Sequence, residues 1–250
     1  MRFDGKVVFI TGGAIGFGRA FARALTAEGA AVAIVDIDGA AGERTAQELR
    51  EAGARAIAIT CDVSDEHQVD SAVAEVVDHL GGVDICINNA GLHLLHFNQP
   101  FSVLSRDDVR ALFDVNVIGV VNCTVACRTS MASRGGGAVL NISSIAGSMS
   151  TSPYGVSKLA VRGLTMAFAT ELAADRIRVN AIAPGLMATE NALDGLPQEM
   201  VDDFVENRQL VHRLGTMDDV VSTALFLLSD DAGFITGETL QVSGGYPLGI

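Results

Sequence analysis

Residues 6–18 read KVVFITGGAIGFG, a short apolar run that passes directly into a glycine-rich turn. The run KVVFIT is almost continuously apolar, which is typical of a strand covered on both faces of a sheet. Residues 16–29 that follow have the spacing of an amphipathic helix. Strand, glycine turn and helix in this order predict the start of a βαβ unit.

The same alternation continues along the chain. Strands are predicted at residues 6–11, 31–36, 56–62, 83–88, 138–143, 177–183 and 239–242, and helices at about 16–29, 39–52, 65–80, 105–133, 154–174 and 218–229. Strands that alternate with helices form parallel sheets through right-handed crossovers. We therefore predict an α/β, doubly wound Rossmann fold with a seven-stranded parallel sheet flanked by helices on both faces.

No Pro/Ser-rich or charged linker divides the chain, so residues 1–250 are predicted to form a single domain. One irregular stretch, about 186–214, is too long for an ordinary connection and contains a weak amphipathic helix around 198–207. It is interpreted as a substrate lid, and a surface insertion without function is the alternative.

Charge and composition exclude several classes of partner. The chain has 17 Lys and Arg against 30 Asp and Glu, a net charge of −13, which disfavours nucleic acid and anionic membrane surfaces. The longest uncharged stretch, 135–157, contains six Ser, five Gly and one Pro, which disfavours a membrane span. A cytoplasmic protein is expected, because the first residues lack the apolar core of a secretion signal. The four cysteines lie in apolar segments and are expected to be core residues, with no metal site.

The turn after the first strand predicts a dinucleotide site. Gly12, Gly16 and Gly18 let the backbone turn tightly and approach a pyrophosphate at the positive end of the following helix. The spacing is GxxxGxG rather than GxGxxG. No Lys-Ser/Thr pair follows, which excludes a P-loop.

Asp36 ends the second strand, where its carboxylate can accept hydrogen bonds from both adenosine ribose hydroxyls. It would repel a 2′-phosphate, and neither Ile15 nor Ile37 supplies a cation, so NAD is favoured over NADP. Asp62 could accept a hydrogen bond from the adenine amino group, or it could be a turn or capping residue. A methyltransferase would need the same glycine loop and carboxylate, so this half of the chain leaves the chemistry open.

Tyr154 and Lys158 are four residues apart on a predicted helix that Ser152 would cap and Pro153 would begin. Their side chains therefore project from one helical face. A phenol with a pKa of about 10 is a poor proton carrier at neutral pH. A neighbouring ammonium and an oxidised nicotinamide ring would stabilise the phenolate, which makes Tyr154 a candidate acid/base.

These motifs give the sequence a close resemblance to the short-chain dehydrogenases/reductases. The motifs are TGGAIGFG (11–18), DV (Asp62 and Val63), NNAG (88–91), Asn116, NISS (141–144), YGVSK (154–158), NAIAPGLMAT (180–189) and ITGETLQVSGG (235–245). They cover nearly the whole chain, in an order that is highly specific. One departure is the interval from Ser144 to Tyr154, which is a few residues shorter than is usual in the family.

The resemblance implies roles for individual residues. Tyr154 would be the general acid/base, Ser144 would polarise the substrate oxygen, Lys158 would hold the nicotinamide ribose and lower the tyrosine pKa, and Asn116 would anchor a water that relays protons. Ser143 is the alternative to Ser144. The implied cofactor-binding residues are Gly12, Ile15, Gly16, Gly18, Asp36, Asp62, Val63, Asn89, Ala90, Gly91, Tyr154, Lys158, Pro184, Gly185, Met187 and Thr189.

The sequence therefore predicts an NAD-dependent oxidoreductase that transfers a hydride between a secondary alcohol or ketone and the nicotinamide. The alternative is a catalytically silent NAD(H)-binding sensor. The residues after Gly91 and those of the lid are mainly apolar, which favours a hydrophobic substrate, and His93 or His96 could contact it or be ordinary loop residues. Surplus apolar positions on helices 105–133 and 154–174 favour a homo-oligomer, and the resemblance implies a tetramer.

Overall fold

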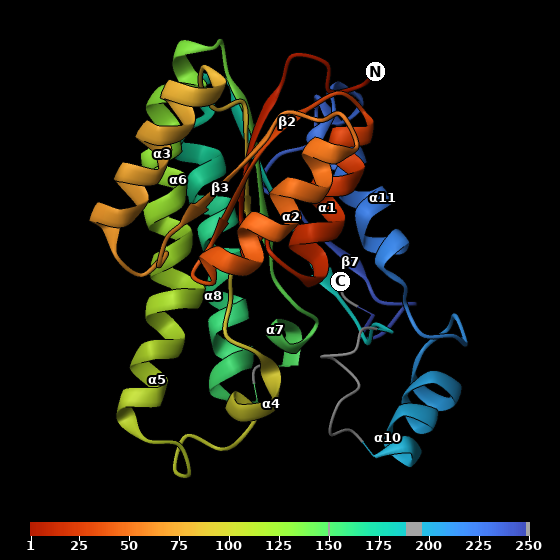
Figure 1. The fold of residues 1–250 in the computed structure, drawn as a ribbon. Helices are drawn as coiled ribbons and strands as arrows, with labels where there is room; N and C mark the ends of the chain where they lie inside the picture. Colours follow the sequence, from red (N-terminus) through yellow and green to blue (C-terminus); the bar gives the residue numbers. More distant parts are fainter. Residues whose placement is uncertain (150, 189–196, 249–250) are drawn as a thin grey trace.

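The computed structural model describes residues 1–149, 151–188 and 197–248 (Figure 1). Seven strands form one parallel sheet in the order β3-β2-β1-β4-β5-β6-β7. The strands are β1 (Val7–Thr11), β2 (Ala31–Asp36), β3 (Ala56–Thr60), β4 (Ile85–Asn88), β5 (Gly137–Ile142), β6 (Ile177–Pro184) and β7 (Thr239–Val242). The predicted seven-stranded parallel sheet is confirmed.

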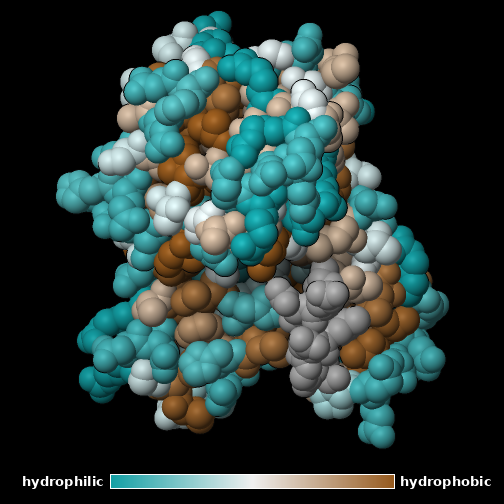
Figure 2. All heavy atoms as spheres, in the orientation of Figure 1, coloured by the Kyte–Doolittle hydropathy of each residue, from teal (hydrophilic) through white to brown (hydrophobic). Residues whose placement is uncertain are grey.

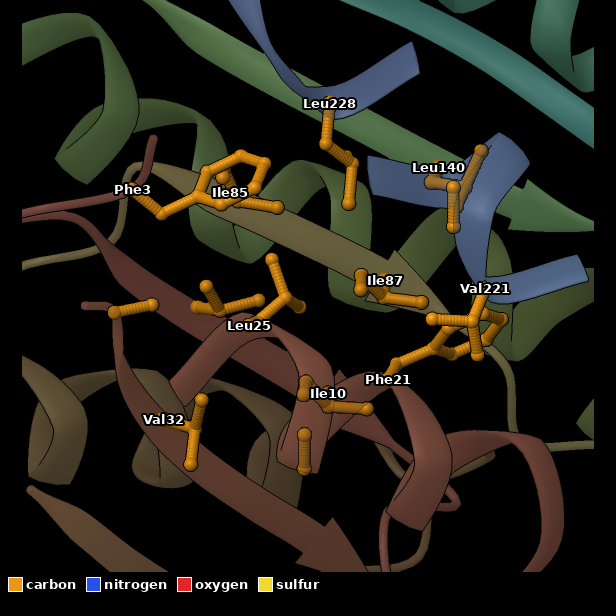
Figure 3. Packing of buried hydrophobic residues seen from close by; sticks show 14 of the residues in the cluster. Phe3, Ile10, Phe21, Leu25, Val32, Ile85, Ile87, Leu140, Val221 and Leu228 are labelled. Atoms are coloured by element: carbon orange, nitrogen blue, oxygen red, sulfur yellow. The ribbon is translucent and has the colours of Figure 1, made fainter. Parts of the chain in front are cut away.

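Helices cover both faces of the sheet (Figure 1). One face carries α1 (Gly16–Ala27), α2 (Gly39–Glu51) and α11 (Met217–Leu228), and the other carries α3 (Glu66–Leu80), α6 (Gly119–Ser133) and α8 (Pro153–Glu171). Figure 3 shows the first interface, where Phe21 and Leu25 of α1 pack with Ile10, Ile87 and Val221. Side chains from both faces of each strand are thereby buried, which explains why the strands are apolar without alternation.

The predicted helix at 105–133 is one continuous helix, Arg106–Ser133, in three parts. These are α5 (Arg106–Phe113), a π-helical segment (Asp114–Ile118) and α6. It is the one helix among the described residues that is long and apolar enough to cross a membrane. Its side chains Cys123, Cys127 and Met131 are buried against the sheet, so this face of the helix belongs to the protein core.

Short elements that the sequence did not reveal gather at the carboxyl ends of the strands. They are α4 (Leu94–Phe97) and α7 (Ala146–Met149). The helix predicted around 198–207 is present as α10 (Gln198–Asp203), at the same end of the sheet in the lower part of Figure 1. A π-helical segment, Phe204–Arg208, follows α10, and single 3₁₀ turns occur at Ala173–Asp175 and Asp230–Ala232. Four-residue helices have too few periodic positions to be recognised from a sequence.

All four cysteines are free and buried, which confirms them as core residues. They lie on the face of the sheet covered by α3, α6 and α8. Burial raises the pKa of the Cys61 thiol to about 11, so this thiol is kept protonated and unreactive at neutral pH.

The strand order places a crevice between two strands. From β1 the chain proceeds outward through β2 and β3, and then returns to the other side of β1 with β4. In open parallel sheets, the loops after the two central strands diverge at this point and leave room for a ligand. The loops after β1 and β4 contain the glycine turn and the NNAG motif, so the fold brings these two motifs together.

Candidate active site

The glycine turn has the backbone geometry that its sequence predicted. Gly12 has φ +59° and Gly16 has φ +55°, a region that side chains rarely occupy. The Asn89 side-chain amide donates to the carbonyls of Thr11 (3.0 Å) and Gly12 (2.9 Å). The NNAG motif therefore fixes the shape of the glycine turn across the β1–β4 crevice.

The amino end of α1 is open to an anion. Its N-cap residue, Ile15, makes no side-chain capping hydrogen bond, and its side chain is exposed. The first amides of the helix therefore keep their hydrogen-bonding capacity, and the helix dipole makes this end positive. Open amides beside Gly12 and Gly16 fit the pyrophosphate of a dinucleotide.

Asp36 is the last residue of β2, as predicted, and it lies beside the glycine turn. Its carboxylate accepts hydrogen bonds from the backbone amides of Ala14 (3.0 Å) and Asp38 (3.1 Å). The Ile37 side chain next to Asp36 is 70% exposed and carries no charge. Two backbone donors hold the carboxylate at the rim of the crevice, where it can face a ribose.

Asp62 is engaged in a turn. Its carboxylate accepts from the amide (2.9 Å) and the hydroxyl (2.7 Å) of Ser64. Val63 is buried and lies against Gly119, where a Cβ would come within 2.7 Å of a Val63 methyl. The structure thus shows that Asp62 stabilises a turn. Its contact with adenine stays a prediction.

Ser144, Tyr154 and Lys158 meet at the carboxyl end of β5. Ser152 caps α8 through the Gly155 amide (3.3 Å), and Pro153 begins the helix, as predicted. The Ser144 hydroxyl makes a hydrogen bond with the Tyr154 phenol. The Lys158 ammonium lies 5.8 Å from the centre of the Tyr154 ring and donates to the Ile142 carbonyl (2.9 Å).

The two serines after β5 are distinguished by their partners. The Ser143 hydroxyl is buried and donates to the Lys158 carbonyl (2.8 Å), inside the α8–β5 contact. The Ser144 hydroxyl reaches Tyr154 and also accepts from the Ala146 amide (3.1 Å). Ser144, and not Ser143, therefore faces the phenol.

Burial dominates the pKa values of Tyr154 and Lys158. The lowering of the tyrosine pKa by Lys158 together with an oxidised nicotinamide stays a prediction. Burial raises the pKa of Tyr154 to about 12, and the Ser144 hydrogen bond opposes this only in part. Burial also lowers the pKa of Lys158 to about 8. The reason is that removal from water disfavours both charged forms, and an ammonium 5.8 Å from the ring does not compensate for that loss.

The Lys158 pKa predicts a pH dependence of stability. The unfolded chain binds more protons than the folded chain between pH 8 and 10.5, so the contribution of Lys158 to the free energy of unfolding rises with pH in that window. The full change is about 3 kcal/mol, because one pKa unit corresponds to about 1.4 kcal/mol. Urea unfolding at pH 7.5, 8.5 and 9.5 should show this rise as the difference between the wild type and Lys158→Met. Parallel pH profiles for the two proteins would contradict the assignment.

Asn116 is buried in the π-helical segment and connects three parts of the site. Its carbonyl oxygen accepts from the Leu92 amide (2.7 Å), and its amide group donates to the Ser157 hydroxyl (3.2 Å). A Cβ on Gly91 would lie 3.2 Å from the Asn116 oxygen and 3.5 Å from the Lys158 nitrogen. The loop after β4 is thereby held against α8, next to the ammonium.

The predicted carboxamide-binding segment begins at the end of β6. The Pro184 carbonyl accepts from the Ile145 amide (3.1 Å), and the Gly185 amide donates to Val242 (2.9 Å). The Met187 side chain is buried in the core, so only its backbone could meet a cofactor. Thr189 and residues 190–196 of the predicted lid lie outside the described residues.

The two candidate substrate-contacting histidines differ in environment. His96 lies in α4, 3.6 Å from the Asp108 carboxylate, and its ring packs edge-on against Phe97, as an ordinary surface histidine would. The pKa of His93 is lowered by burial and by the Lys158 ammonium, which puts this imidazole near the Tyr154–Lys158 cluster. Figure 2 shows patches of apolar surface at this end of the molecule, and the side chains of Leu95, Met200 and Leu210 are exposed.

Sequence reasoning missed a buried polar chain beneath the site. The Asn88 amide group donates to Thr124 (3.0 Å) and Asn141 (2.8 Å), and Asn141 donates to Thr165 (2.9 Å). It also missed Thr11, whose hydroxyl accepts from the Asn89 and Ala90 amides. Polar residues inside apolar strands and helices were the available signal, because such groups are buried only with partners.

Comparison with known proteins agrees with this geometry. A family model described as enoyl-(acyl carrier protein) reductase, of the short-chain dehydrogenase/reductase group, matches residues 12–247. The chain belongs to the short-chain dehydrogenase/reductase family. It is therefore an oxidoreductase of alcohols and ketones that uses a nicotinamide cofactor.

Relatives of this short-chain dehydrogenase/reductase match it over nearly its full length. An uncharacterized oxidoreductase of Mycobacterium tuberculosis is 40% identical over 97% of this chain and 98% of its own. The meso-2,3-butanediol dehydrogenase of Serratia marcescens is 38% identical over 98% of this chain and 96% of its own. A solved 7α-hydroxysteroid dehydrogenase, in complex with NADH and 7-oxoglycochenodeoxycholic acid, is 32% identical, with a TM-score of 0.90 over 98% of this chain and 95% of its own.

Proposed function

We propose that this chain is an NAD-dependent dehydrogenase that interconverts a hydrophobic secondary alcohol and its ketone, with Tyr154 as the general acid/base. The observation that supports this most strongly is the cluster of Ser144, Tyr154 and Lys158. The cluster lies at the carboxyl end of the sheet, on the same side as the glycine turn. A proton carrier and a dinucleotide site are the two parts that hydride transfer at a carbinol carbon requires.

The dinucleotide would be held by groups from several loops. The open amides after Gly12 and Gly16 would bind its pyrophosphate, Asp36 its adenosine ribose and Lys158 its nicotinamide ribose. Asn89, Ala90 and Gly91 would line one side, and the Pro184–Gly185 backbone the other. When bound, the nicotinamide accepts or supplies the hydride.

The protein's own residues would move the proton. Tyr154 would take the proton from the carbinol hydroxyl during oxidation and return it to the carbonyl oxygen during reduction. Ser144, which already bonds the phenol, would donate to the same substrate oxygen and fix its position. Because burial raises the pKa of Tyr154 to about 12, its phenolate needs added positive charge, which the oxidised nicotinamide would supply together with Lys158.

Asn116 would support this proton movement. Both polar atoms of its side chain are engaged with Leu92 and Ser157. The water relay implied by the family resemblance would then use the remaining hydrogen-bonding capacity of Asn116. We propose that the Asn116 side chain holds the loop after Gly91 against α8.

The experiment that tests this function is a screen of purified protein with NAD⁺ against secondary alcohols and vicinal diols of increasing apolar size, followed by NADH absorbance. Turnover that increases with apolar size is expected. The butanediol and hydroxysteroid dehydrogenases among the relatives support this range of substrates. Absence of turnover in both directions, despite bound NADH, would contradict the proposal.

Asp36 predicts a cofactor preference that can be measured separately. NADH should bind at least about 100-fold more tightly than NADPH, because a 2′-phosphate would approach the carboxylate. Asp36→Asn keeps the size of the side chain and an acceptor for the Ala14 amide, and it should narrow the ratio to about tenfold or less. Asp38→Asn, two residues away at the cap of α2, should leave the ratio unchanged. Fluorescence titration measures both affinities, and equal wild-type affinities would refute the assignment.

We also propose a homotetramer in the cytoplasm. Support for association comes from exposed apolar side chains on the α6 and α8 helices, with Val125 53%, Leu159 47% and Met166 59% exposed. Such a surface is typical of faces covered by another subunit. We further propose that residues 186–214 form a substrate lid. In support, the Gly215 amide donates to the Leu186 carbonyl (3.1 Å), which holds the two ends of this stretch together next to β6.

A further inference from the structure

Arg162 reaches the active-site loop from the helix that bears the tyrosine. It lies four residues after Lys158 and eight after Tyr154, so all three side chains project from one side of α8. Its guanidinium donates to the Ser144 carbonyl (2.9 Å) and the Ser148 hydroxyl (2.9 Å). A third, longer bond connects its Nε to the Ser143 hydroxyl (3.4 Å).

These contacts span the short loop between Ser144 and Tyr154. α7 lies beside α8 at the lower end of the sheet (Figure 1), and Arg162 binds residues on both sides of the start of α7. β5 ends at Ile142, and the amides of Ser143 and Ile145, on either side of Ser144, still donate to the β6 carbonyls of Ile182 (2.8 Å) and Pro184 (3.1 Å). The Ser144 carbonyl accepts from the Gly147 amide (3.1 Å) within the loop and from Arg162 (2.9 Å) across it, so Arg162 ties the Ser144 backbone to α8.

The guanidinium has unusual partners for a cation in this position. Burial lowers the pKa of Arg162, and its recorded partners are one carbonyl and two hydroxyls. No carboxylate pairs with it among the residues that the structure describes. A planar fork with several fixed donors can hold a loop at several points, which a lysine cannot do.

We propose that Arg162 is a positioning residue that fixes Ser144 against Tyr154 by clamping the loop at residues 143–148. This inference rests on the proposed function, in which Ser144 orients the substrate oxygen. A displacement of about 1 Å at such a residue can reduce turnover by about 100-fold. Arg162 itself touches neither the phenol nor the ammonium in the recorded contacts, so it would act through Ser144.

The test is a double-mutant cycle of Arg162→Met and Ser144→Ala. In the wild-type background, Arg162→Met should lower kcat by about tenfold to 100-fold, with KM and NADH affinity changed less than about threefold. In the Ser144→Ala background, the same substitution should change kcat less than about twofold, because the residue through which it acts is absent. Arg162→Lys should recover part of the loss. Equal effects in the two backgrounds would overturn the proposal.

Arg178 provides the matched control. It is also a partly buried arginine bonded to carbonyls, those of Leu227 (2.8 Å) and Ser229 (3.0 Å), and burial lowers its pKa too. These contacts lie near the amino end of β6, away from the active site. Arg178→Met should lower the melting temperature but leave kcat within about twofold. If Arg178→Met lowered kcat as much as Arg162→Met, general destabilisation would explain both losses. That result would overturn the proposal.

Two further measurements keep the test decisive. If Arg162→Met does not fold, Ser148→Ala removes one of its partners, and a few-fold loss of kcat that disappears with Ser144→Ala is expected. An unchanged kcat in Ser148→Ala would then contradict the clamp. Amide hydrogen exchange of residues 143–149 should be faster in the Arg162 variant than in the Arg178 variant. Hydrogen exchange does not depend on turnover. If the wild-type protein is inactive, the proposed function is contradicted, and the exchange rates still test whether Arg162 clamps the loop.

Discussion

Tyr154→Phe should lower turnover by about 10³- to 10⁴-fold and leave NADH affinity within about twofold. The substitution removes one oxygen, which is the atom proposed to exchange a proton with the substrate. The aromatic ring remains, so its packing on α8 and its distance from Lys158 are preserved. The ratio of steady-state kcat values and a fluorescence titration with NADH measure the two quantities separately.

The second tyrosine of the chain is the control for this experiment. Tyr246 packs edge-on against Phe204, with ring centres 5.0 Å apart. Tyr246→Phe removes the same atom from the same residue type and should retain most of the turnover. If Tyr154→Phe kept more than about a tenth of wild-type kcat, another group would have to be the acid/base.

Gly18→Ala should weaken NADH binding by at least about 100-fold and also destabilise the fold. A Cβ on Gly18 would overlap the Gly12 carbonyl oxygen and lie 2.8 Å from the Asn89 side-chain nitrogen. Both neighbours shape the glycine turn, since Asn89 donates to the Gly12 carbonyl. The turn must open to admit one methyl group, which displaces the amides that would bind the pyrophosphate.

Gly163→Ala is the matched substitution, because it also adds a methyl group to a helical glycine. Within one protomer, a Cβ at Gly163 would meet no atom of the described residues within 4 Å, and the residue is exposed on α8. Gly163→Ala should leave the NADH affinity within about twofold, because the added methyl group lies away from the glycine turn. Thermal unfolding and NADH titration of both variants test this contrast. Unchanged NADH affinity in Gly18→Ala would show that the turn does not bind the dinucleotide.

The sequence predicted the sheet and the main helices well because both depend on local patterns. Apolar runs that lack alternation indicate strands covered on two faces, and each run here became a strand of one parallel sheet. The α8 start could be read from Ser152 and Pro153 because caps act over a few residues. The four-residue helices α4 and α7 could not be read, because one turn has no measurable period.

The candidate site was predicted only as a set of separate motifs. Spacing alone placed Tyr154 and Lys158 on one helical face. It left Ser143 and Ser144 as alternatives, because neighbouring residues at the end of a strand point to opposite sides. Contacts across the fold resolved them, since Ser143 bonds the Lys158 carbonyl and Ser144 bonds the phenol.

The amino-acid sequence by itself determined which chemical groups are available and which secondary structures present them, since both follow from short-range spacing and the pattern of burial. The tertiary structure alone decided the environment of those groups. Burial raises the pKa of Tyr154 to about 12 and lowers that of Lys158 to about 8. It likewise brings Arg162 onto Ser144, eighteen positions apart in the chain. Desolvation and long-range hydrogen bonds depend on what the folded chain places around each atom, which no local pattern encodes.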